Sequence, residues 1–246
     1  MPDQTKTTQA VSPANCVDLT GREIVARGNR RDVYLVDPSE LGLPAAEKPL
    51  VLKIPRYKER LAHPHLAKRL VAKLFPSSLE RVIRVEARYW EKLAFRYGQD
   101  PASMPLPLFH GYVNTNEGPA TLWESVWGAN DDLAPTIDDL AKEGDLTSAI
   151  APLNKFVAFC FAANIVAPDI RSGNIVLAQR AGRPEAVLID GFGDMRLFSI
   201  RTLSTRRNTE FMTKRFARMA WKSGLVFDEK RREFSMPAQQ TSDSAP

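Results

Sequence analysis

The N-terminal part of the chain opens with short apolar runs separated by polar turns. A run that ends at Val25 is followed by a turn at residues 27–30 and by the run Val33–Val36, and a third run at residues 50–54 stops at Pro55. Short β-branched runs bounded by Gly, Asn and Pro are typical of strands. The pattern therefore predicts a hairpin followed by a third strand.

Apolar residues then recur every three to four positions between Leu66 and Leu93. This period predicts helix, with an interruption at Pro76. Two further apolar runs, at residues 109–113 and 120–126, flank a polar turn and predict a second hairpin. We therefore expect about five antiparallel strands with one helix packed on them.

The C-terminal half has a mainly helical pattern. An acid lies three residues after Thr136, as at a capped helix start, and an apolar stripe runs from Leu146 to Phe161. Short apolar runs on both sides of residues 180–184 predict one hairpin. A last helix is predicted over residues 205–221, and the ordered part of the chain is expected to end with it.

A strand-rich half followed by a helix-rich half predicts an α+β fold with two lobes. Both ends of the chain are polar and lack an apolar core, so we expect them to be disordered. The predicted organisation is a disordered tail at residues 1–14, a lobe at 15–126, a reduced helical lobe at 127–235 and a disordered tail at 236–246.

The composition says more about the expected location of the protein than about any reaction that it catalyses. The chain has 246 residues, two cysteines far apart and no run of 18 apolar residues. We therefore expect neither a zinc site nor a membrane span. The start of the chain shows no signal-peptide pattern, and a cytoplasmic location is expected.

The formal net charge is +5, and residues 194–233 hold eleven Lys or Arg against five Asp or Glu. A solvated helical face is the simplest explanation of this basic region. The alternative is a surface that attracts phosphate, acidic protein or membrane headgroups. Aromatic residues are not regularly interleaved with the basic ones, and no zinc or helix-turn-helix signature is present, so nucleic-acid binding is not expected.

The sequence APDIRSGNIVL, residues 167–177, places an acid and an amide just before a predicted strand. Asn174 precedes the outgoing strand of the hairpin and Asp190 follows the returning strand, so both should emerge at the same end. Because paired strands lie about 4.8 Å apart, two oxygen-bearing side chains there can share one hard cation. Asp169 lies at the same mouth, and the glycines of residues 191–193 allow a sharp turn beside it.

Each of these residues, taken alone, is more readily explained as a turn or cap residue. Their combination with the strand pattern favours a site for a metal ion and a reacting hydroxyl.

Lys53 interrupts an apolar run, where a lysine is usually a solvated edge residue. Protein kinases, however, place a lysine in a comparable third strand to hold nucleotide phosphates, paired with a helix glutamate. Glu86 alternates with apolar helix positions, so it should lie near the core and need a cation. Glu91, on the same helix, is the alternative partner.

In their order along the chain, these features resemble a bilobal protein-kinase-like fold and, more narrowly, the family of the PhoP regulatory network protein YrbL. The resemblance covers roughly residues 19–221. It rests on GNRRDVYLV (28–36), VLKI around Lys53, GYVNTNEG (111–118), NIVAPDIRSGNIVL (164–177) and LIDGFGD (188–194).

The resemblance implies an ATP- and Mg²⁺-dependent phosphotransferase in a bacterial regulatory network, with a small molecule or a protein as acceptor. Asp169 would position or deprotonate the acceptor hydroxyl, with Arg171 beside it, and Glu86 would orient Lys53. Asn174 and Asp190 would bind Mg²⁺. The implied nucleotide contacts are Gly28, Asn29, Arg30, Lys53, Glu124 and Val126.

The chain also departs from the kinase pattern. The loop before Val33 keeps only Gly28 of three glycines, Ala167 and Pro168 replace the usual His-Arg, and about 56 residues follow Asp190. Two functions therefore stay open: a minimal phosphotransferase, and a pseudokinase that binds nucleotide as a regulatory module without catalysis.

Overall fold

The computed structural model describes residues 16–28, 31–56, 77–97, 103–193 and 204–238, with the backbone alone for residues 77–83. The chain divides into two compact units, Met1–Ser125 and Val126–Pro246. Each unit has its own cluster of buried hydrophobic residues.

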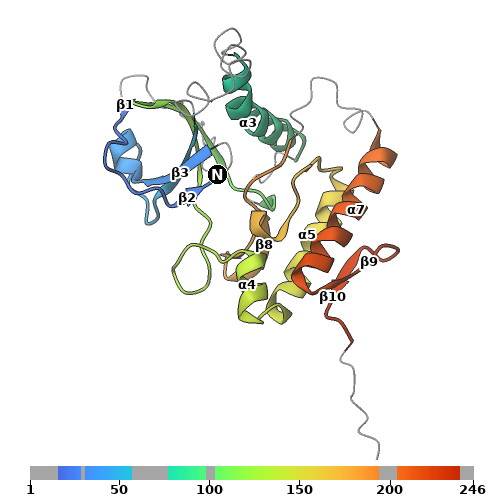
Figure 1. Ribbon diagram of the computed structural model, residues 1–246. Helices are drawn as coiled ribbons and strands as arrows, with labels where there is room; N and C mark the ends of the chain where they lie inside the picture. The colour runs from blue at the N-terminus through green and yellow to red at the C-terminus, as the bar shows by residue number, and fades with distance from the viewer. Residues whose placement is uncertain (1–15, 29–30, 57–76, 98–102, 194–203, 239–246) are drawn as a thin grey trace, which may run out of the picture. The chain divides into compact units, whose positions relative to one another are not determined.

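The first unit is built on a curled sheet with helix α3 (Ser77–Tyr97) beside it (Figure 1). The described strands run in the order β1-β5-β6-β4-β3-β2, and every neighbouring pair is antiparallel except β1 with β5. The strands are β1 (Cys16–Val17), β2 (Ala26–Arg27), β3 (Arg31–Val36), β4 (Leu50–Pro55), β5 (Phe109–Thr115) and β6 (Gly118–Glu124). A 3₁₀ turn, η1 (Pro38–Leu41), follows β3.

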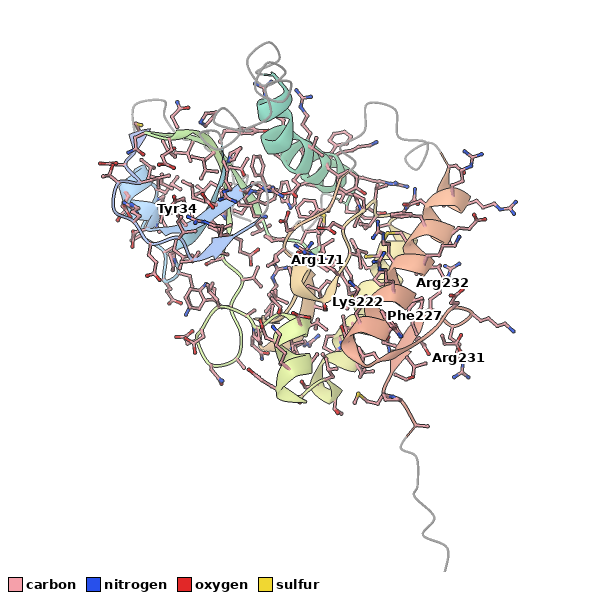
Figure 2. All side chains as sticks on the ribbon, viewed as in Figure 1. Tyr34, Arg171, Lys222, Phe227, Arg231 and Arg232 are labelled. Atoms are coloured by element: carbon pink, nitrogen blue, oxygen red, sulfur yellow. The ribbon has the colours of Figure 1, made fainter. Side chains whose placement is uncertain are left out.

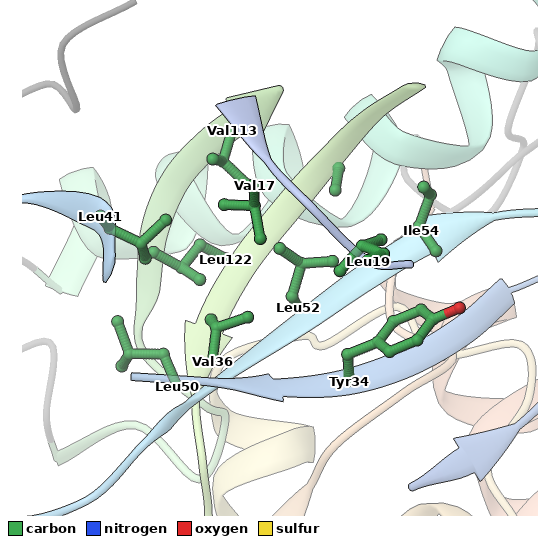
Figure 3. Close-up of a cluster of buried hydrophobic side chains, with 11 residues drawn as sticks. Val17, Leu19, Tyr34, Val36, Leu41, Leu50, Leu52, Ile54, Val113 and Leu122 are labelled. Atoms are coloured by element: carbon green, nitrogen blue, oxygen red, sulfur yellow. The ribbon is translucent and has the colours of Figure 1, made fainter. Parts of the chain in front are cut away.

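Alternation of side chains along each strand gives the sheet two faces. One face carries the hydrophobic cluster in Figure 3, which includes Tyr34, Leu52 and Leu122. Lys53 and Trp123 are the next residues along β4 and β6, so they belong to the opposite face, from which Lys53 reaches Glu86 of α3. Strand register therefore decides that a lysine of an inner strand points toward the helix.

The second unit is mainly helical. Its described helices are α4 (Ile137–Glu143), α5 (Thr147–Ala162) and α7 (Thr205–Ser223), with a 3₁₀ turn, η3 (Ser172–Asn174). One hairpin pairs β7 (Ile175–Arg180) with β8 (Arg183–Leu188), and another pairs β9 (Val226–Asp228) with β10 (Glu233–Ser235).

The start of α4 is a capping box, as the sequence predicts. The Thr136 hydroxyl accepts a hydrogen bond from the Asp139 backbone N–H, and the Asp139 carboxylate accepts one from Thr136 N–H. A further bond from the Thr136 side chain is the main reason why the pKa of Asp139 lies below its usual value.

The β9–β10 hairpin corrects the expectation that the ordered part closes at residue 221. The turn at residues 229–232 consists of charged residues, and the strands on either side of it are too short to show an apolar alternation in the sequence. Phe227 and Phe234 pack on each other with ring centroids 4.9 Å apart, and both pack on Phe216 of α7. Burial against a helix therefore stabilises strands too short to be recognised by pattern.

The predicted α+β class is confirmed. The described sheet has six strands rather than about five, because the two-residue strands β1 and β2 add to its edges. The strand expected around residues 23–25 lies instead at Ala26–Arg27. Among the described residues, no helix has the length and apolar character needed to cross a membrane.

Candidate functional site

Lys53 is a buried cation. It lies in β4 between Val33 of β3 and Thr121 of β6, and only 7 % of its surface is exposed. Its ammonium group lies 5.2 Å from the centroid of the Trp123 ring, which is a cation–π arrangement. The interpretation of Lys53 as a solvated edge residue is therefore wrong.

Glu86 of α3 supplies the nearby carboxylate. It is 5 % exposed, and its Oε2 lies 3.7 Å from the Lys53 ammonium nitrogen, within ion-pair range but longer than a hydrogen bond. Glu91, the alternative partner, is exposed. The structure therefore places Glu86 next to Lys53.

Arg31 is the partner of Glu86 that sequence analysis missed. Its Nη1 lies 2.6 Å from Glu86 Oε2 and its Nη2 lies 2.7 Å from Oε1, a two-pronged pairing of the strong, charge-assisted kind. Arg31 begins β3, so it lies within the motif expected to cover a nucleotide, but nothing in the sequence joins it to residue 86. These distances make Arg31 the closer partner of Glu86.

Gly28, just after β2, is hydrogen-bonded to the first residue of β3. The Gly28 N–H donates to the Arg31 carbonyl oxygen at 2.9 Å. Asn29 and Arg30, both expected nucleotide contacts, lie outside the described residues. The Gly28 amide is therefore used within the hairpin.

The β7–β8 hairpin delivers Asn174 and Asp190 to the same end. Ile175 pairs with Leu188, and Ile189 N–H donates to the Asn174 carbonyl oxygen at 2.9 Å, which extends the ladder by one step. Asn174 thus precedes one strand and Asp190 follows the other. The local geometry is the one that strand pairing predicts.

A hydrogen-bond network joins Asp169, Arg171 and Asn174. The Asn174 side-chain N–H group donates to the Asp169 backbone oxygen at 2.8 Å and to its Oδ2 at 3.2 Å. The Asn174 Oδ1 accepts from Arg171 Nε at 3.0 Å, and the same nitrogen lies 3.5 Å from Asp169 Oδ2. Asn174 is buried, whereas the Asp169 side chain is 59 % exposed. A buried amide therefore orients an accessible carboxylate.

Because Gly191 has no side chain, Asp169 and Asn174 can both lie close to its backbone. It has a left-handed backbone (φ +81°), and a Cβ atom there would lie 2.8 Å from Asp169 Cβ and 3.2 Å from Asn174 Nδ2. Its N–H donates to Asp190 Oδ1 at 2.8 Å. Only glycine fits this position without displacing the residues around it.

Asn208 of α7 anchors the segment that leads to Asp169, and sequence analysis missed it. Its side-chain N–H group donates to Asn164 Oδ1 and to the Ile165 carbonyl oxygen, each at 2.9 Å, and the residue is 2 % exposed. Asn164 has a left-handed φ of 51° just beyond the end of α5. A buried Asn on a later helix carries no sequence signal of this contact.

Glu124 and Val126 are two of the nucleotide contacts that the family resemblance implies. The Glu124 carboxylate accepts from Leu108 N–H at 2.9 Å. Val126 belongs to the buried cluster of the second unit, and its carbonyl oxygen accepts from Ala134 N–H at 2.9 Å. The Val126 carbonyl is therefore already used within the chain.

The donor set at the end of the β7–β8 hairpin fits a hard cation. Amide and carboxylate oxygens are the ligands that Mg²⁺ prefers, and each keeps lone-pair capacity beyond the hydrogen bond it accepts here. In the described part of the chain, no group of three or more His, Cys, Asp or Glu side chains is arranged to hold a metal ion. A cation held by Asn174 and Asp190 would therefore need further ligands from a bound molecule or water.

The solved structures that resemble this chain include protein kinase domains. The PknI kinase domain of Mycobacterium tuberculosis, a double mutant, gives a TM-score of 0.43 at 12% identity over 93% of this chain and 82% of that one. The BubR1 kinase domain gives 0.49 at 11% identity over 94% and 73%, respectively. No curated protein matches the sequence. The family model described as PhoP regulatory network protein YrbL matches residues 17–224, and the chain therefore belongs to that family.

Proposed function

We propose that this member of the YrbL family is an ATP- and Mg²⁺-dependent phosphotransferase whose acceptor is a small molecule or a protein. The observation that carries the proposal is the exposed Asp169 carboxylate oriented by the buried Asn174 amide. An accessible carboxylate in a fixed orientation suits removal of a proton from a hydroxyl group. The same hairpin end delivers Asp190.

In this proposal, Asp169 accepts the proton of the acceptor hydroxyl. A bond forms between the acceptor oxygen and the γ-phosphorus, the bond from that phosphorus to the β–γ bridging oxygen breaks, and ADP leaves. Lys53 would hold phosphate oxygens, Glu86 would orient Lys53, and Asn174 and Asp190 would hold Mg²⁺. A bound Mg²⁺ would offset the negative charge of the phosphates.

Arg171 has a positioning role in this scheme. Its Nε donates to Asn174 Oδ1 and lies close to Asp169 Oδ2, so one guanidinium keeps both side chains in register. Its side chain is 61 % exposed, which leaves it accessible to an anionic substrate as well.

A second candidate function is nucleotide binding without transfer, as in a pseudokinase. One observation favours it. The Gly28 amide is used to close its own hairpin. A backbone donor of the kind that kinases offer to phosphate is thus engaged inside the chain.

Thermal melting with Mg-ATP tests nucleotide binding, which both candidates require. At 100 times the Kd, a ligand adds about 2.7 kcal/mol of stability, a rise in Tm of roughly 5–10 °C for a domain of this size. ADP and EDTA arms separate the contributions of the γ-phosphate and of Mg²⁺. No shift at millimolar Mg-ATP rejects both candidates.

Phosphate transfer from labelled ATP, including autophosphorylation, then separates the two. Asp169→Asn should keep the Mg-ATP shift and lose transfer at least about 100-fold, the usual contribution of a general base. Asp145→Asn, an exposed acid in the same unit, is the matched control and should retain both. A melting shift without any transfer supports the pseudokinase, and equal transfer by wild type and Asp169→Asn removes the role given to Asp169.

A further inference from the structure

Helix α7 carries a row of positive charge on its exposed side. Arg207, Lys214, Arg218 and Lys222 are all exposed and are separated by seven, four and four residues. At 3.6 residues per turn these spacings place the four side chains on one face, over a length of about 22 Å. The opposite face is buried and consists of Asn208, Met212, Phe216, Met219, Ala220 and Ser223.

Within the described part of the chain, no ion pair involves this row. Glu210 is the single acid of α7, and it pairs with Arg206 at 3.2 Å. None of the four row residues makes an ion pair with another described residue. Lys214, Arg218 and Lys222 follow one another at four-residue intervals, and like charges at that spacing destabilise a helix.

Trp221 lies on the same face and is 80 % exposed. It follows Arg218 by three residues and precedes Lys222, so its ring belongs to the C-terminal end of the row. Tryptophan is highly buried on average in folded proteins, because its large apolar surface is poorly hydrated. Tryptophan and arginine are also the residue types most enriched among those that dominate binding at protein interfaces.

We propose that these five residues, called the basic stripe (Arg207, Lys214, Arg218, Trp221 and Lys222), dock an acidic helix of a partner protein. The stripe is a straight, convex ridge with cations one or two turns apart. A partner helix with acids at i, i+4 and i+8 repeats that spacing and opposes each cation with a carboxylate. An apolar residue of the partner covers Trp221. The inference is independent of the phosphotransferase proposal.

Two other anionic partners fit the stripe less well. Membrane-surface helices insert a continuous apolar face, but the apolar face of α7 is buried in its own unit and leaves only Trp221. Single-stranded nucleic acid stacks successive bases on several aromatic rings, and the stripe offers one ring. An acidic helix needs only the spaced cations and a single anchor.

The test uses the full chain and a fluorescein-labelled, helical 20-residue peptide. The peptide carries Glu at i, i+7, i+11 and i+15 and one Leu beside the last Glu, and an isomer of the same composition spreads its Glu around the helix. We expect the patterned peptide to bind at least about fivefold tighter by anisotropy, and both to weaken as salt shortens the screening length. Equal affinity for the two peptides overturns the proposal.

Variants assign any binding to the stripe. Reversal of all four cations (R207E, K214E, R218E, K222E) should weaken binding of the patterned peptide at least about tenfold, and Trp221→Ala about fivefold. The control reverses Lys230 and Arg231, which are exposed in the turn between β9 and β10, and its affinity should stay within about twofold of the wild type. Arg231 is labelled in Figure 2.

If the quadruple variant fails to fold, Trp221→Ala still tests whether the peptide binds at the stripe. The exposed Trp221 ring contributes little to packing, so this variant should fold. Unchanged peptide affinity in Trp221→Ala counts against the stripe, as does equal loss in the control. Phosphatidylserine vesicles and a 12-nucleotide DNA strand serve as competing probes. If either probe binds more tightly than the patterned peptide, and if the quadruple reversal abolishes that binding, the assignment to an acidic helix is overturned.

Discussion

The two units hold their candidate residues in place by different means. In the first unit, Lys53 and Glu86 are buried charges and Arg31 is a partly buried one, and the carboxylate lies within reach of both cations. In the second unit, Asp169 is exposed, and backbone groups, a buried amide and the room left at Gly191 fix its position. The stability of the first unit should therefore depend on side-chain charge and that of the second on backbone geometry.

Glu86→Ala should have the largest effect. Removal of one member of a buried ion pair leaves an uncompensated charge, which costs about 3–5 kcal/mol. Denaturant unfolding measures the loss in the free energy of unfolding. Glu91→Ala, an exposed acid on the same helix, should change it by less than about 0.5 kcal/mol. Similar losses in both variants would remove the contrast between the units.

Gly191→Ala should come next, although it changes no charge. Its φ is left-handed, and the new Cβ would meet Asp169 Cβ at 2.8 Å, so we expect a loss of about 1–3 kcal/mol. Gly173→Ala, in η3 before β7 and with open space around it, should cost little. Unfolding curves for the two variants measure the difference, and an unchanged midpoint for Gly191→Ala would mean that the loop yields easily.

Asn208→Ala should cost about 1–2 kcal/mol, because it removes one buried and one partly buried hydrogen bond to the segment before Asp169. Amide hydrogen exchange should rise at residues 164–169. Asn154→Ala is the matched control, since its amide bonds Phe234 of β10 and its loss should raise exchange at residues 226–235 instead. Faster exchange in the same segment for both variants would contradict the local anchor.

The smallest effect concerns pH. Burial of His110 in β5 holds its pKa below the usual 6.5, and the nearby Glu124 only partly opposes this. The unfolded chain therefore binds the proton more readily, and stability falls as the pH drops below about 6.5. Residues 126–246 contain no histidine. Unfolding of the first unit, followed by a probe in that unit, should become less pH-dependent in His110→Gln; an unchanged profile would contradict the assignment.

Local pattern was sufficient for much of this chain. Strand and helix periods predict the α+β class, and the Thr136 capping box and the β7–β8 hairpin are readable from a few neighbouring residues. Hairpin pairing alone brings Asn174 and Asp190 to one end, because antiparallel strands return to where they began. The capping box and the hairpin depend on hydrogen bonds within a short stretch of the chain, so the sequence alone is sufficient to predict them.

Contacts between distant segments required the tertiary structure. Arg31 and Glu86 are 55 residues apart, and Asn208 reaches back to Asn164 across 44 residues. The hydrophobic periodicity of a helix or strand does not predict which of its residues will contact a residue of another element. The β9–β10 hairpin likewise forms because Phe227 and Phe234 bury against Phe216. The orientation of buried charges and amides was decided by packing, because a buried polar group persists only where the complete fold brings it a partner.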